Sequence, residues 1–475
     1  MTSLVRRRSA LAVASVAATI VLAISLLARR PASVEERLLR EFRDAYPAEA
    51  RDTGRERRYE VRAAPSEVPQ LDGRRLAVWA YDGRVPGPTL RVRLGETLRF
   101  ELTNDLPQPT TIHWHGVRVP NAMDGVPGVT QPPIPPGGKF VYRFAPKDPG
   151  TFWFHPHLRG SEQLERGLYG VLIVEDENPL PYSQDVVWVL DDWLITREGE
   201  IDPAFNTPRD LMHDGRWGNV VTVNGSTREE LVVKAGERIR LRLVDAANGR
   251  VFAPDFAGLD AKVIAVDGTY TARPLAPAGF ELAPGNRLDL DVTFGPEQRG
   301  RTIVVMDRFT RRPFPLASIR VLDEVVATPK FPAPTNPRVP AWKEGMSVPV
   351  RGQYLLNARR GGEFGIEWTI NDRAFPGHAM PVGPAETLPP NRWSRLRFVN
   401  QSFRLHPMHI HGQFFKVLAR DGKPVDEPFF RDTVLVHRKE TVDVGIVPLD
   451  RGTWMLHCHI QEHAEAGMMT LLEVG

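Results

Sequence analysis

The chain has 475 residues, of which 42% are hydrophobic and 25% are charged, and these proportions are ordinary for a globular protein. The formal net charge is +3, but residues 1–30 hold five arginines and no acid, and taking those five charges away leaves about −2 for the rest. This balance excludes a strongly basic surface, so we expect no nucleic-acid partner. The length allows about two to four domains.

The N-terminus predicts export or anchoring. An arginine triplet at 6–8 precedes an apolar run over residues 10–28, which ends at a second arginine pair. We interpret residues 1–30 as a signal or a single membrane anchor. The paired arginines weakly resemble a twin-arginine signal, and an ordinary signal anchor is the alternative. Either way, the body is expected in the periplasm or elsewhere outside the cytoplasm, after a charged, helix-like spacer over residues 31–57.

A pattern occurs three times in the body. In each copy, a turn tripeptide leads to a strand of alternating apolar and polar residues, at 94–100, 235–241 and 391–398. The copies are about 140 to 155 residues apart, which is the size of a β-sandwich domain and too long for a solenoid repeat. Alternation of this kind is typical of half-buried strands.

These repeats predict an all-β fold with three β-sandwich domains. We place the domains at 58–178, 183–325 and 348–475. Residues 326–347 are rich in proline and are predicted to form a linker across the surface.

Ten of the 13 histidines lie in four short motifs of the first and third predicted domains. The motifs are His113-Trp114-His115-Gly116, His155-Pro156-His157, His406-Pro407-Met408-His409-Ile410-His411, and His457-Cys458-His459 followed by His463. Residues two apart on a strand point the same way, so four His-x-His pairs offer eight imidazoles. One pair alone is more often structural. Eight imidazoles are too many for one ion and indicate a cluster, with copper, zinc, iron and nickel as candidates.

A second ligand set is predicted on the opposite face. Cys458, the only cysteine, lies between His457 and His459 and therefore points away from them. The set that can gather there is His406, Cys458, His463 and Met468. Two imidazoles, a thiolate and a weakly bound thioether are typical of a blue electron-transfer copper, with zinc as the alternative. Met469 competes with Met468, although core packing is its simpler role.

The two predicted sites lie back to back across one strand. Covalent bonds from Cys458 to its neighbours His457 and His459 connect them. This arrangement suits a reaction in which a substrate gives single electrons while dioxygen needs four to become two waters.

In order and position, the four motifs resemble those of the multicopper oxidases, the family of laccases and bacterial cuprous oxidases. The resemblance covers nearly all of the chain after residue 58. It implies three cupredoxin-like Greek-key β-sandwich domains, the middle one without ligands, and four copper ions: one type 1, one type 2 and two type 3. By resemblance, the type 1 ligands are His406, Cys458 and His463 with Met468 axial, the type 2 ligands are His113 and His409, and the type 3 ligands are His115, His155, His157, His411, His457 and His459.

Reducing dioxygen to water consumes protons, so carboxylates are expected near the cluster. Asp124, in Met123-Asp124-Gly125, matches a family acid near the type 2 copper, and a plain turn aspartate is the alternative. Many bacterial members carry an acid directly after the last type 1 histidine, where this chain has Ala464. We therefore consider Glu465 and Glu462 as proton-relay candidates, with a solvated face as the alternative.

We predict a laccase-like oxidase of phenols or aromatic amines, because the ten methionines are scattered rather than gathered in a methionine-rich insertion. The alternative is a cuprous or other metal-ion oxidase in copper tolerance. A third hypothesis, a copper-binding scaffold without turnover, is disfavoured by the full ligand set. The expected partners are a small-molecule or metal-ion electron donor and dioxygen, and we expect a monomer. His213, His378 and His437 are expected to be structural or surface residues.

Overall fold

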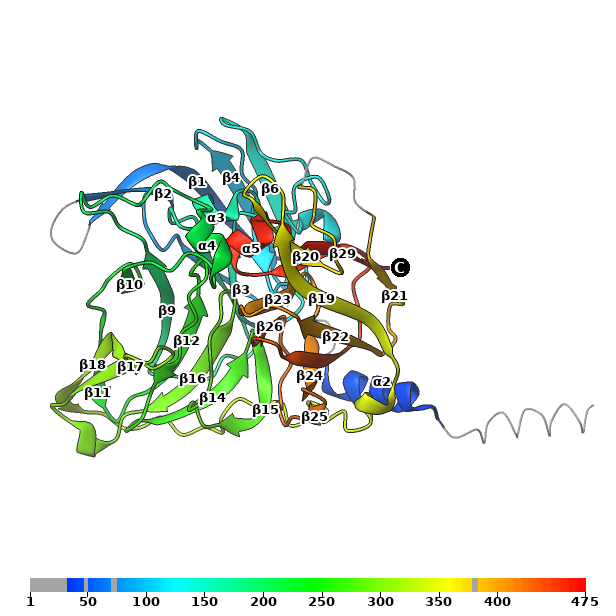
Figure 1. Cartoon of the computed structure of the whole chain (residues 1–475). Coiled ribbons are helices and arrows are strands. Elements are labelled where there is room, and N and C mark those ends of the chain that lie inside the picture. The colour runs from blue at the N-terminus through cyan, green and yellow to red at the C-terminus, as the bar shows by residue number, and fades with distance from the viewer. Residues whose placement is uncertain (1–31, 47–49, 70–74, 378–382) are drawn as a thin grey trace, which may run out of the picture.

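The computed structural model of the chain describes residues 32–46, 50–69, 75–377 and 383–475 (Figure 1). The apolar segment over residues 1–30 lies outside this part, so the signal or anchor stays a prediction. Within the part described, no helix combines the length and the apolar character needed to cross a membrane.

Strands form most of the molecule. The described residues contain six sheets, which pack in pairs as three β-sandwiches that follow one another along the chain. In the view of Figure 1, the second sandwich (green) lies beside the third (yellow to red), and the first (blue to cyan) lies above both. The prediction of an all-β fold with three sandwich domains is confirmed.

The first sandwich pairs the sheet β2-β1-β4-β6 with the sheet β3-β8-β7-β5. Burial alternates along β4, because every second side chain points into the core. Its elements are β1 Glu56–Pro69, β2 Arg75–Tyr81, β3 Thr89–Arg93, β4 Thr97–Asn104, β5 His113–His115, η1 Asn121–Met123, β6 Lys139–Phe144, β7 Gly150–His155, α3 Gly160–Gln163 and β8 Gly170–Glu175.

The second sandwich pairs the sheet β10-β9-β12-β16-β14-β15 with the sheet β11-β18-β17-β13. Its elements are β9 Gln184–Trp193, α4 Pro208–Met212, β10 Val220–Val223, β11 Glu230–Ala235, β12 Arg238–Asp245, β13 Pro254–Asp255, β14 Asp260–Val266, β15 Thr269–Leu275, β16 Arg287–Thr293, η2 Pro296–Gln298, β17 Thr302–Asp307 and β18 Phe314–Val325.

The third sandwich pairs the sheet β20-β19-β22-β27-β24-β25 with the sheet β21-β29-β28-β23-β26. Its elements are η3 Gly345–Ser347, β19 Val350–Arg360, β20 Ile366–Ile370, β21 Glu386–Leu388, β22 Ser394–Asn400, β23 His406–Ile410, β24 Phe415–Arg420, β25 Lys423–Pro424, β26 Thr433–Val436, β27 Thr441–Ile446, β28 Gly452–Cys458, α5 Gln461–Glu465 and β29 Met469–Val474.

The repeated turn has the same physical role in each sandwich. Its central residues, Asp82, Asn224 and Asn371, all have positive φ, between 52° and 53°. Asp and Asn tolerate this left-handed conformation better than most residues. Each of the three side chains accepts a hydrogen bond from a backbone N–H in the first strand of its own sandwich, at 2.9, 2.9 and 2.7 Å. The turn therefore ties the end of the second strand of each sandwich to the first strand.

The segment predicted as a charged spacer contains helix α2, Val34–Ala45. Its sequence is mostly charged, but Leu38, Phe42 and Ala45 fall on one face and are buried. Phe42 packs on Trp342 of the predicted linker, with ring centroids 6.3 Å apart, and the Trp342 indole N–H donates to the Leu38 carbonyl at 3.2 Å. The two segments thus cover each other beside the third sandwich (Figure 1).

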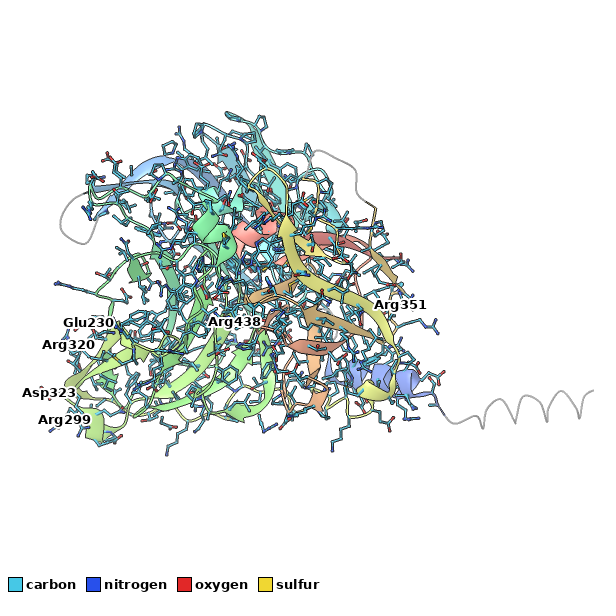
Figure 2. The ribbon with its side chains drawn as sticks, in the orientation of Figure 1. Glu230, Arg299, Arg320, Asp323, Arg351 and Arg438 are labelled. Atoms are coloured by element: carbon cyan, nitrogen blue, oxygen red, sulfur yellow. The ribbon has the colours of Figure 1, made fainter. Side chains whose placement is uncertain are left out.

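Charged pairs occupy two kinds of position. Arg299 and Asp323, 3.9 Å apart, are exposed at the far edge of the second sandwich, on the left of Figure 2. Exposed pairs of this kind contribute about 0–1 kcal/mol. Arg438, near the centre of the same view, instead reaches from the third sandwich to Asp214 of the second at 2.7 Å. This pair joins the two sandwiches.

Candidate metal centres

A shared core brings the first and third sandwiches together. Trp114 and Phe154 of the first sandwich belong to the same buried cluster as Phe414 and Trp454 of the third. Trp114 lies between two motif histidines in β5, and Trp454 lies in β28, which ends at Cys458. This cluster therefore connects the two sandwiches that carry the histidine motifs.

Strand register sets the histidines on one face. In the first sandwich His113 lies opposite His155, and in the third His409 lies opposite His457. Cα partners in antiparallel strands carry their side chains on the same face of the sheet. The two sets interleave: the rings of His113 and His411 stack with centroids 3.7 Å apart.

Eight of the ten motif histidines collect into three buried groups, in each of which the ligand atoms lie within 4.8 Å of one another. The groups are His115 with His155 and His459, His157 with His411 and His457, and His113 with His115 and His409. The first two groups together contain the six residues predicted for the type 3 pair, three for each ion. The third contains the two residues predicted for the type 2 ion.

The nitrogen atoms of these rings fit a bound metal. Among the described residues, five ring nitrogens of these groups are buried and have no hydrogen-bond partner; they are His113 Nε2, His115 Nδ1, His155 Nε2, His409 Nε2 and His459 Nε2. A buried polar atom without a partner costs about 1–3 kcal/mol, so such a concentration needs a ligand. On His155 and His409 the other nitrogen is fixed, at 2.9 Å from the Pro156 carbonyl and 3.0 Å from the Asp432 carbonyl. An all-imidazole set of this kind suits copper.

Burial keeps the rings in the form that binds metals. Desolvation, followed by the neighbouring histidines, holds the pKa values of His115, His155, His411 and His459 well below the usual range. Neutral imidazole is the ligand form, so these side chains are ready to bind cations at neutral pH.

Asp124 connects histidines from two sandwiches. Its buried carboxylate has Oδ2 2.8 Å from His411 Nδ1 and Oδ1 3.3 Å from His113 Nδ1. The following Gly125 has φ +81°, and a Cβ there would lie 1.8 Å from the Ile112 carbonyl oxygen. Asp124 is thus both a turn residue and a partner of two candidate ligands. Carboxylates in this position orient metal-binding histidines.

Asp432 plays a similar part, and sequence reasoning missed it. Its Oδ1 lies 3.1 Å from His115 Nε2, and its carbonyl accepts from His409 Nδ1 at 3.0 Å. Burial alone would raise the pKa of Asp432, but Arg287 beside it brings that pKa well below the usual range. The only sequence signal is the polar pair Asp432-Thr433 at the start of an otherwise apolar strand.

A second candidate site lies on the other face of β28. Cys458 Sγ is 3.6 Å from His406 Nδ1 and 3.8 Å from His463 Nδ1, and all three side chains are fully buried. Helix α5 turns the chain so that His463 returns to Cys458. The distal nitrogens are held by the Ser402 hydroxyl and the His213 carbonyl, both at 2.8 Å. This donor set fits one copper ion of the blue type.

Strand pairing separates the two methionines. In the β28–β29 ladder, Met469 lies opposite His457 and shares its face. Met468 is one residue earlier, so it takes the face of Cys458, and the two belong to one buried cluster. The register therefore favours Met468 over Met469 as the thioether near Cys458.

The thiol of Cys458 is protonated without metal. Burial raises the pKa of Cys458, whereas burial lowers that of His463 to about 4. Thiolate is the metal-binding form of cysteine, so copper must displace a proton when it binds here.

The two glutamates of α5 face different surroundings. Glu465 accepts hydrogen bonds from Asn206 Nδ2 at 2.6 Å and from the Ser161 hydroxyl, and it lines a cavity of about 30 Å³ beside His157 and His457. A space of this size holds about one water molecule.

Glu462 points toward the second sandwich instead. It accepts from Asn248 Nδ2 at 2.9 Å and from the Arg216 N–H at 3.1 Å. Burial raises the pKa of Glu462 to about 7. It is not among the residues that line the cavity beside Glu465.

The unmatched histidines differ in role. His213 is exposed, and only its carbonyl reaches the second site. His437 Nε2 lies 3.0 Å from Glu281, whose hydrogen bond raises the pKa of His437. His378 lies outside the described residues.

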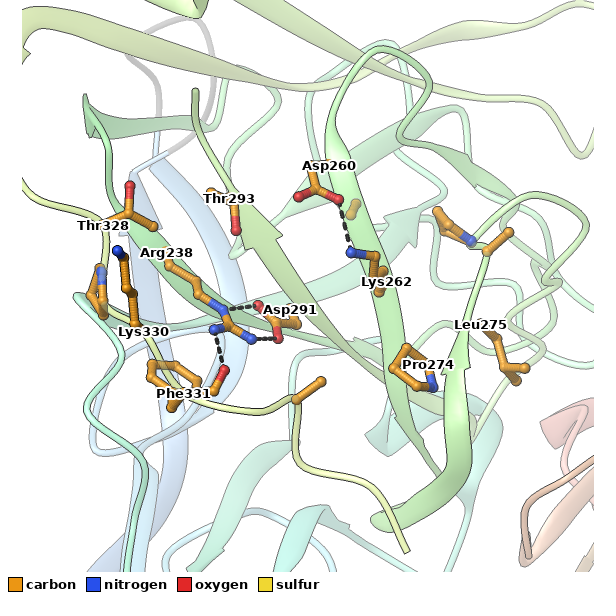
Figure 3. Close-up of a pocket in the computed structure, with 15 residues that line it drawn as sticks. Arg238, Asp260, Lys262, Pro274, Leu275, Asp291, Thr293, Thr328, Lys330 and Phe331 are labelled. Carbon is orange, nitrogen blue, oxygen red and sulfur yellow. Dashed lines mark hydrogen bonds and ion pairs between the residues drawn. The ribbon is translucent and has the colours of Figure 1, made fainter. Parts of the chain in front are cut away.

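A larger cavity lies elsewhere, on the second sandwich. It has a volume of about 720 Å³ and is bordered by Arg238, Asp260, Lys262, Asp291 and Phe331, among others. Figure 3 shows that these charges pair with one another: Arg238 with Asp291 at 2.5 and 2.8 Å, and Lys262 with Asp260 at 3.2 Å. No motif histidine lines this cavity, so it plays no part in the metal centres.

Comparisons with known proteins agree with the three-sandwich arrangement. Three families, each described as multicopper oxidase, match residues 63–179, 184–313 and 343–475. A multicopper oxidase structure from Pseudomonas thermotolerans is 34% identical, covers 88% of this chain and 99% of its own, and superposes with a TM-score of 0.78. The chain is 28% identical to multicopper oxidase MmcO of Mycobacterium tuberculosis, over 90% of this chain and 89% of that protein. It is 25% identical to laccase-1 of Cryptococcus neoformans, over 85% and 78%.

Proposed function

Because the chain belongs to the multicopper oxidase family, we propose that it is a laccase-like enzyme that oxidises phenols or aromatic amines one electron at a time. As a member it is a copper-dependent oxidoreductase with oxygen as acceptor. The proposal assigns one ion to His406, Cys458 and His463, with Met468 axial. It assigns three further ions to the buried histidine groups.

The observation that carries the proposal is the division of one strand between two sites. His457 and His459 belong to histidine groups on one face of β28, and Cys458 belongs to the other site. When bound, copper would supply a one-electron acceptor at Cys458 and dioxygen reduction at the histidine groups. The protein itself supplies the short covalent path through the backbone on either side of Cys458.

Asp124 fits the role of holding two candidate ligands in place. It joins His113 and His411, which come from different sandwiches, so its carboxylate fixes their relative orientation. We include it in the proposal as an orienting group and as a local proton acceptor or donor.

One observation favours a metal-ion donor as the second candidate function. Met212 is 52% exposed and adjoins His213, whose carbonyl contacts His463. A thioether is a soft ligand that suits cuprous ion. Cuprous ion could therefore give its electron on this surface, as expected of an oxidase in copper tolerance.

The two functions are separated by oxygen uptake of the copper-loaded protein with a phenol and with cuprous ion. We expect faster turnover of the phenol, and no change in that rate in Met212→Ala. If the protein strongly prefers cuprous ion and Met212→Ala abolishes that preference, metal-ion oxidation becomes the first candidate function and phenol oxidation the second. If the copper-loaded protein consumes no oxygen with either donor, a copper-binding scaffold without turnover is favoured.

Glu465 is proposed to deliver protons toward the histidine groups. Burial raises the pKa of Glu465, so it keeps its proton to higher pH than an ordinary glutamate. In Glu465→Gln we expect dioxygen reduction to fall by about 10²-fold or more, the usual effect of losing a positioned acid. The wild-type rate should decline as pH rises through this pKa, and the variant should lack that decline.

The matched control is Glu462→Gln, because Glu462 lies on the same helix but faces Asn248. Anaerobic reduction of the blue copper by donor should be unchanged in Glu465→Gln, since the Glu465 carboxylate is bonded to Asn206 and Ser161 rather than to the Cys458 site. A larger loss of dioxygen reduction in Glu462→Gln than in Glu465→Gln would contradict the assignment.

We further propose that the body acts outside the cytoplasmic membrane as a monomer, with residues 1–30 as its export signal or anchor. The apolar run and its arginines support this placement. Fractionation of cells that produce the full chain tests it.

A further inference from the structure

The middle sandwich contributes no predicted ligand, yet one of its turns lies against the histidine groups. Gly285 has φ +92°, and a Cβ at this position would lie 2.8 Å from His115 Cε1 and 3.1 Å from His459 Cδ2. Only glycine allows both the conformation and the approach. The second sandwich therefore touches rings from the first and from the third.

Arg287, two residues later, contacts all three sandwiches. It is 1% exposed, and its Nε donates to the Thr151 carbonyl of the first sandwich at 3.1 Å. Its Nη1 and Nη2 donate to the two carboxylate oxygens of Asp432, in the third sandwich, at 2.9 and 2.6 Å. A two-point guanidinium–carboxylate pair is strong and fixes the plane of the carboxylate.

Asp432 lies beside two candidate ligands, His115 and His409. Its Oδ1 lies 3.1 Å from His115 Nε2, and it lies 3.5 Å from His409 Nδ1. The opposite nitrogens of the same rings, His115 Nδ1 and His409 Nε2, are the unpartnered atoms that would bind metal. Thr433 Oγ1 also lies near both rings, 3.2 Å from His115 Nε2 and 3.0 Å from His409 Nδ1, and the Asp432 carbonyl lies 3.0 Å from His409 Nδ1. The rotation of the His115 ring therefore depends in part on the carboxylate, and that of the His409 ring depends on the backbone segment that carries it.

The chain makes room for this pair. Gly116 ends the first histidine motif with φ +80°, and a Cβ there would lie 2.2 Å from Arg287 Nη2 and 2.5 Å from Asp432 Oδ2. Any side chain at Gly116 would push the guanidinium away from the carboxylate.

A separate set of bonds holds the backbone around Asp432. Asp267 Oδ2 accepts from the N–H groups of Asp432 and Thr433, both at 3.3 Å, and Asn286 Nδ2 donates to the Thr433 carbonyl at 3.0 Å. Asp267 is also paired with the guanidinium, because Arg287 Nη1 lies 3.7 Å from Asp267 Oδ1. Loss of Arg287 should therefore free the Asp432 carboxylate directly and also affect, through Asp267, the backbone segment whose carbonyl contacts His409.

We propose that Arg287 is a positioning residue through which the ligand-free middle sandwich sets the orientation of His115 and His409, by way of Asp432. The inference rests on the copper cluster of the proposed function. It gives the second sandwich a defined part in the chemistry that its sequence, without predicted ligands, does not suggest.

The test compares copper-loaded Arg287→Met and Arg287→Lys with the wild type. In Arg287→Met we expect the blue absorption of the Cys458 site to remain, because no contact joins the two residues. The electron paramagnetic resonance signal of the type 2 copper should change or lose intensity, and dioxygen reduction should slow by about 10–100-fold, as when partners of metal ligands are removed elsewhere. Arg287→Lys keeps the charge but not the two-point geometry, so its type 2 signal and its rate of dioxygen reduction should lie between those of Arg287→Met and the wild type.

Arg240→Met is the matched control. Arg240 is also buried, also makes two bonds to one aspartate, Asp289, at 3.0 and 2.6 Å, and contacts no histidine. The blue absorption and the type 2 resonance signal of Arg240→Met should match those of the wild type, even if the melting temperature of the variant falls.

The proposal is overturned if both Arg287 variants keep the wild-type electron paramagnetic resonance parameters and the wild-type rate of dioxygen reduction, whatever their stability. If Arg287→Met does not fold, Arg287→Lys decides: an altered type 2 signal supports the proposal and an unaltered one overturns it. Absence of a type 2 signal in the wild type itself would instead contradict the copper cluster.

Discussion

Replacing Cys458 by serine is expected to abolish the blue absorption and to lower turnover by at least about 10³-fold, which corresponds to ~4 kcal/mol at 1.36 kcal/mol per tenfold. Serine keeps the shape of the side chain, but its hydroxyl is a poor copper ligand, so His406 and His463 lose their third donor at 3.6 and 3.8 Å. The histidine groups on the other face keep every ring. We therefore expect three coppers per chain instead of four.

Absorption, copper count and oxygen uptake on one preparation check this result. The fold should survive, because a buried hydroxyl without a partner costs about 1–3 kcal/mol, less than the stability of most domains. A blue band that persists in Cys458→Ser would show that the site is misassigned. Loss of all four coppers would show that the two sites are not independent.

Replacing His155 by glutamine is expected to have the opposite pattern. His155 belongs to the group with His115 and His459, and its Nε2 is one of the unpartnered nitrogens. The Cys458 site contains no atom of this group, so the blue colour should remain. Oxygen uptake should fall by at least about 10³-fold, again ~4 kcal/mol. Donor should then bleach the blue band once, and air should not restore it.

His437→Gln is the control for this variant. His437 is partly exposed, its ring pairs with Glu281 at 3.0 Å, and it belongs to none of the metal groups among the described residues. It should show wild-type colour and wild-type oxygen uptake. Rapid recovery of the blue band in His155→Gln would mean that His155 is not needed for dioxygen reduction. Together with Cys458→Ser, the two variants test each site while the other is kept.

The Arg287 variants test an indirect effect on the cluster, because Arg287 is not a predicted metal ligand. Partners of ligands usually change affinity or rate by less than the ligands themselves. We therefore expect an ordered series in dioxygen reduction, in which His155→Gln loses most, Arg287→Met less and Arg287→Lys least. This order would show that Arg287 of the middle sandwich affects the copper cluster, but less than a residue that binds copper directly.

Much of the fold followed from local patterns in the chain. Alternating residues predicted the strands, and the repeated tripeptide predicted three similar units, whose central Asp82, Asn224 and Asn371 share one conformation. The helical character of the spacer was visible in its sequence, but the packing of helix α2 was not, because its charged residues hide a narrow apolar face of three buried side chains. Its partner, Trp342, lies 300 positions after Phe42 in the chain, and no local pattern indicates that contact.

The face of the strand that each candidate ligand takes follows from residue spacing alone. Parity separates Cys458 from His457 and His459 wherever the segment is extended, because successive side chains on a strand point to opposite sides. Only the tertiary structure decided which rings share a group, that Met468 rather than Met469 lies on the face of Cys458, and that Asp432 and Arg287 stand behind His115. Those outcomes depend on register and on the packing of sandwiches against one another. Such contacts join residues up to about 320 positions apart, as between His115 and Asp432, and no local periodicity encodes them.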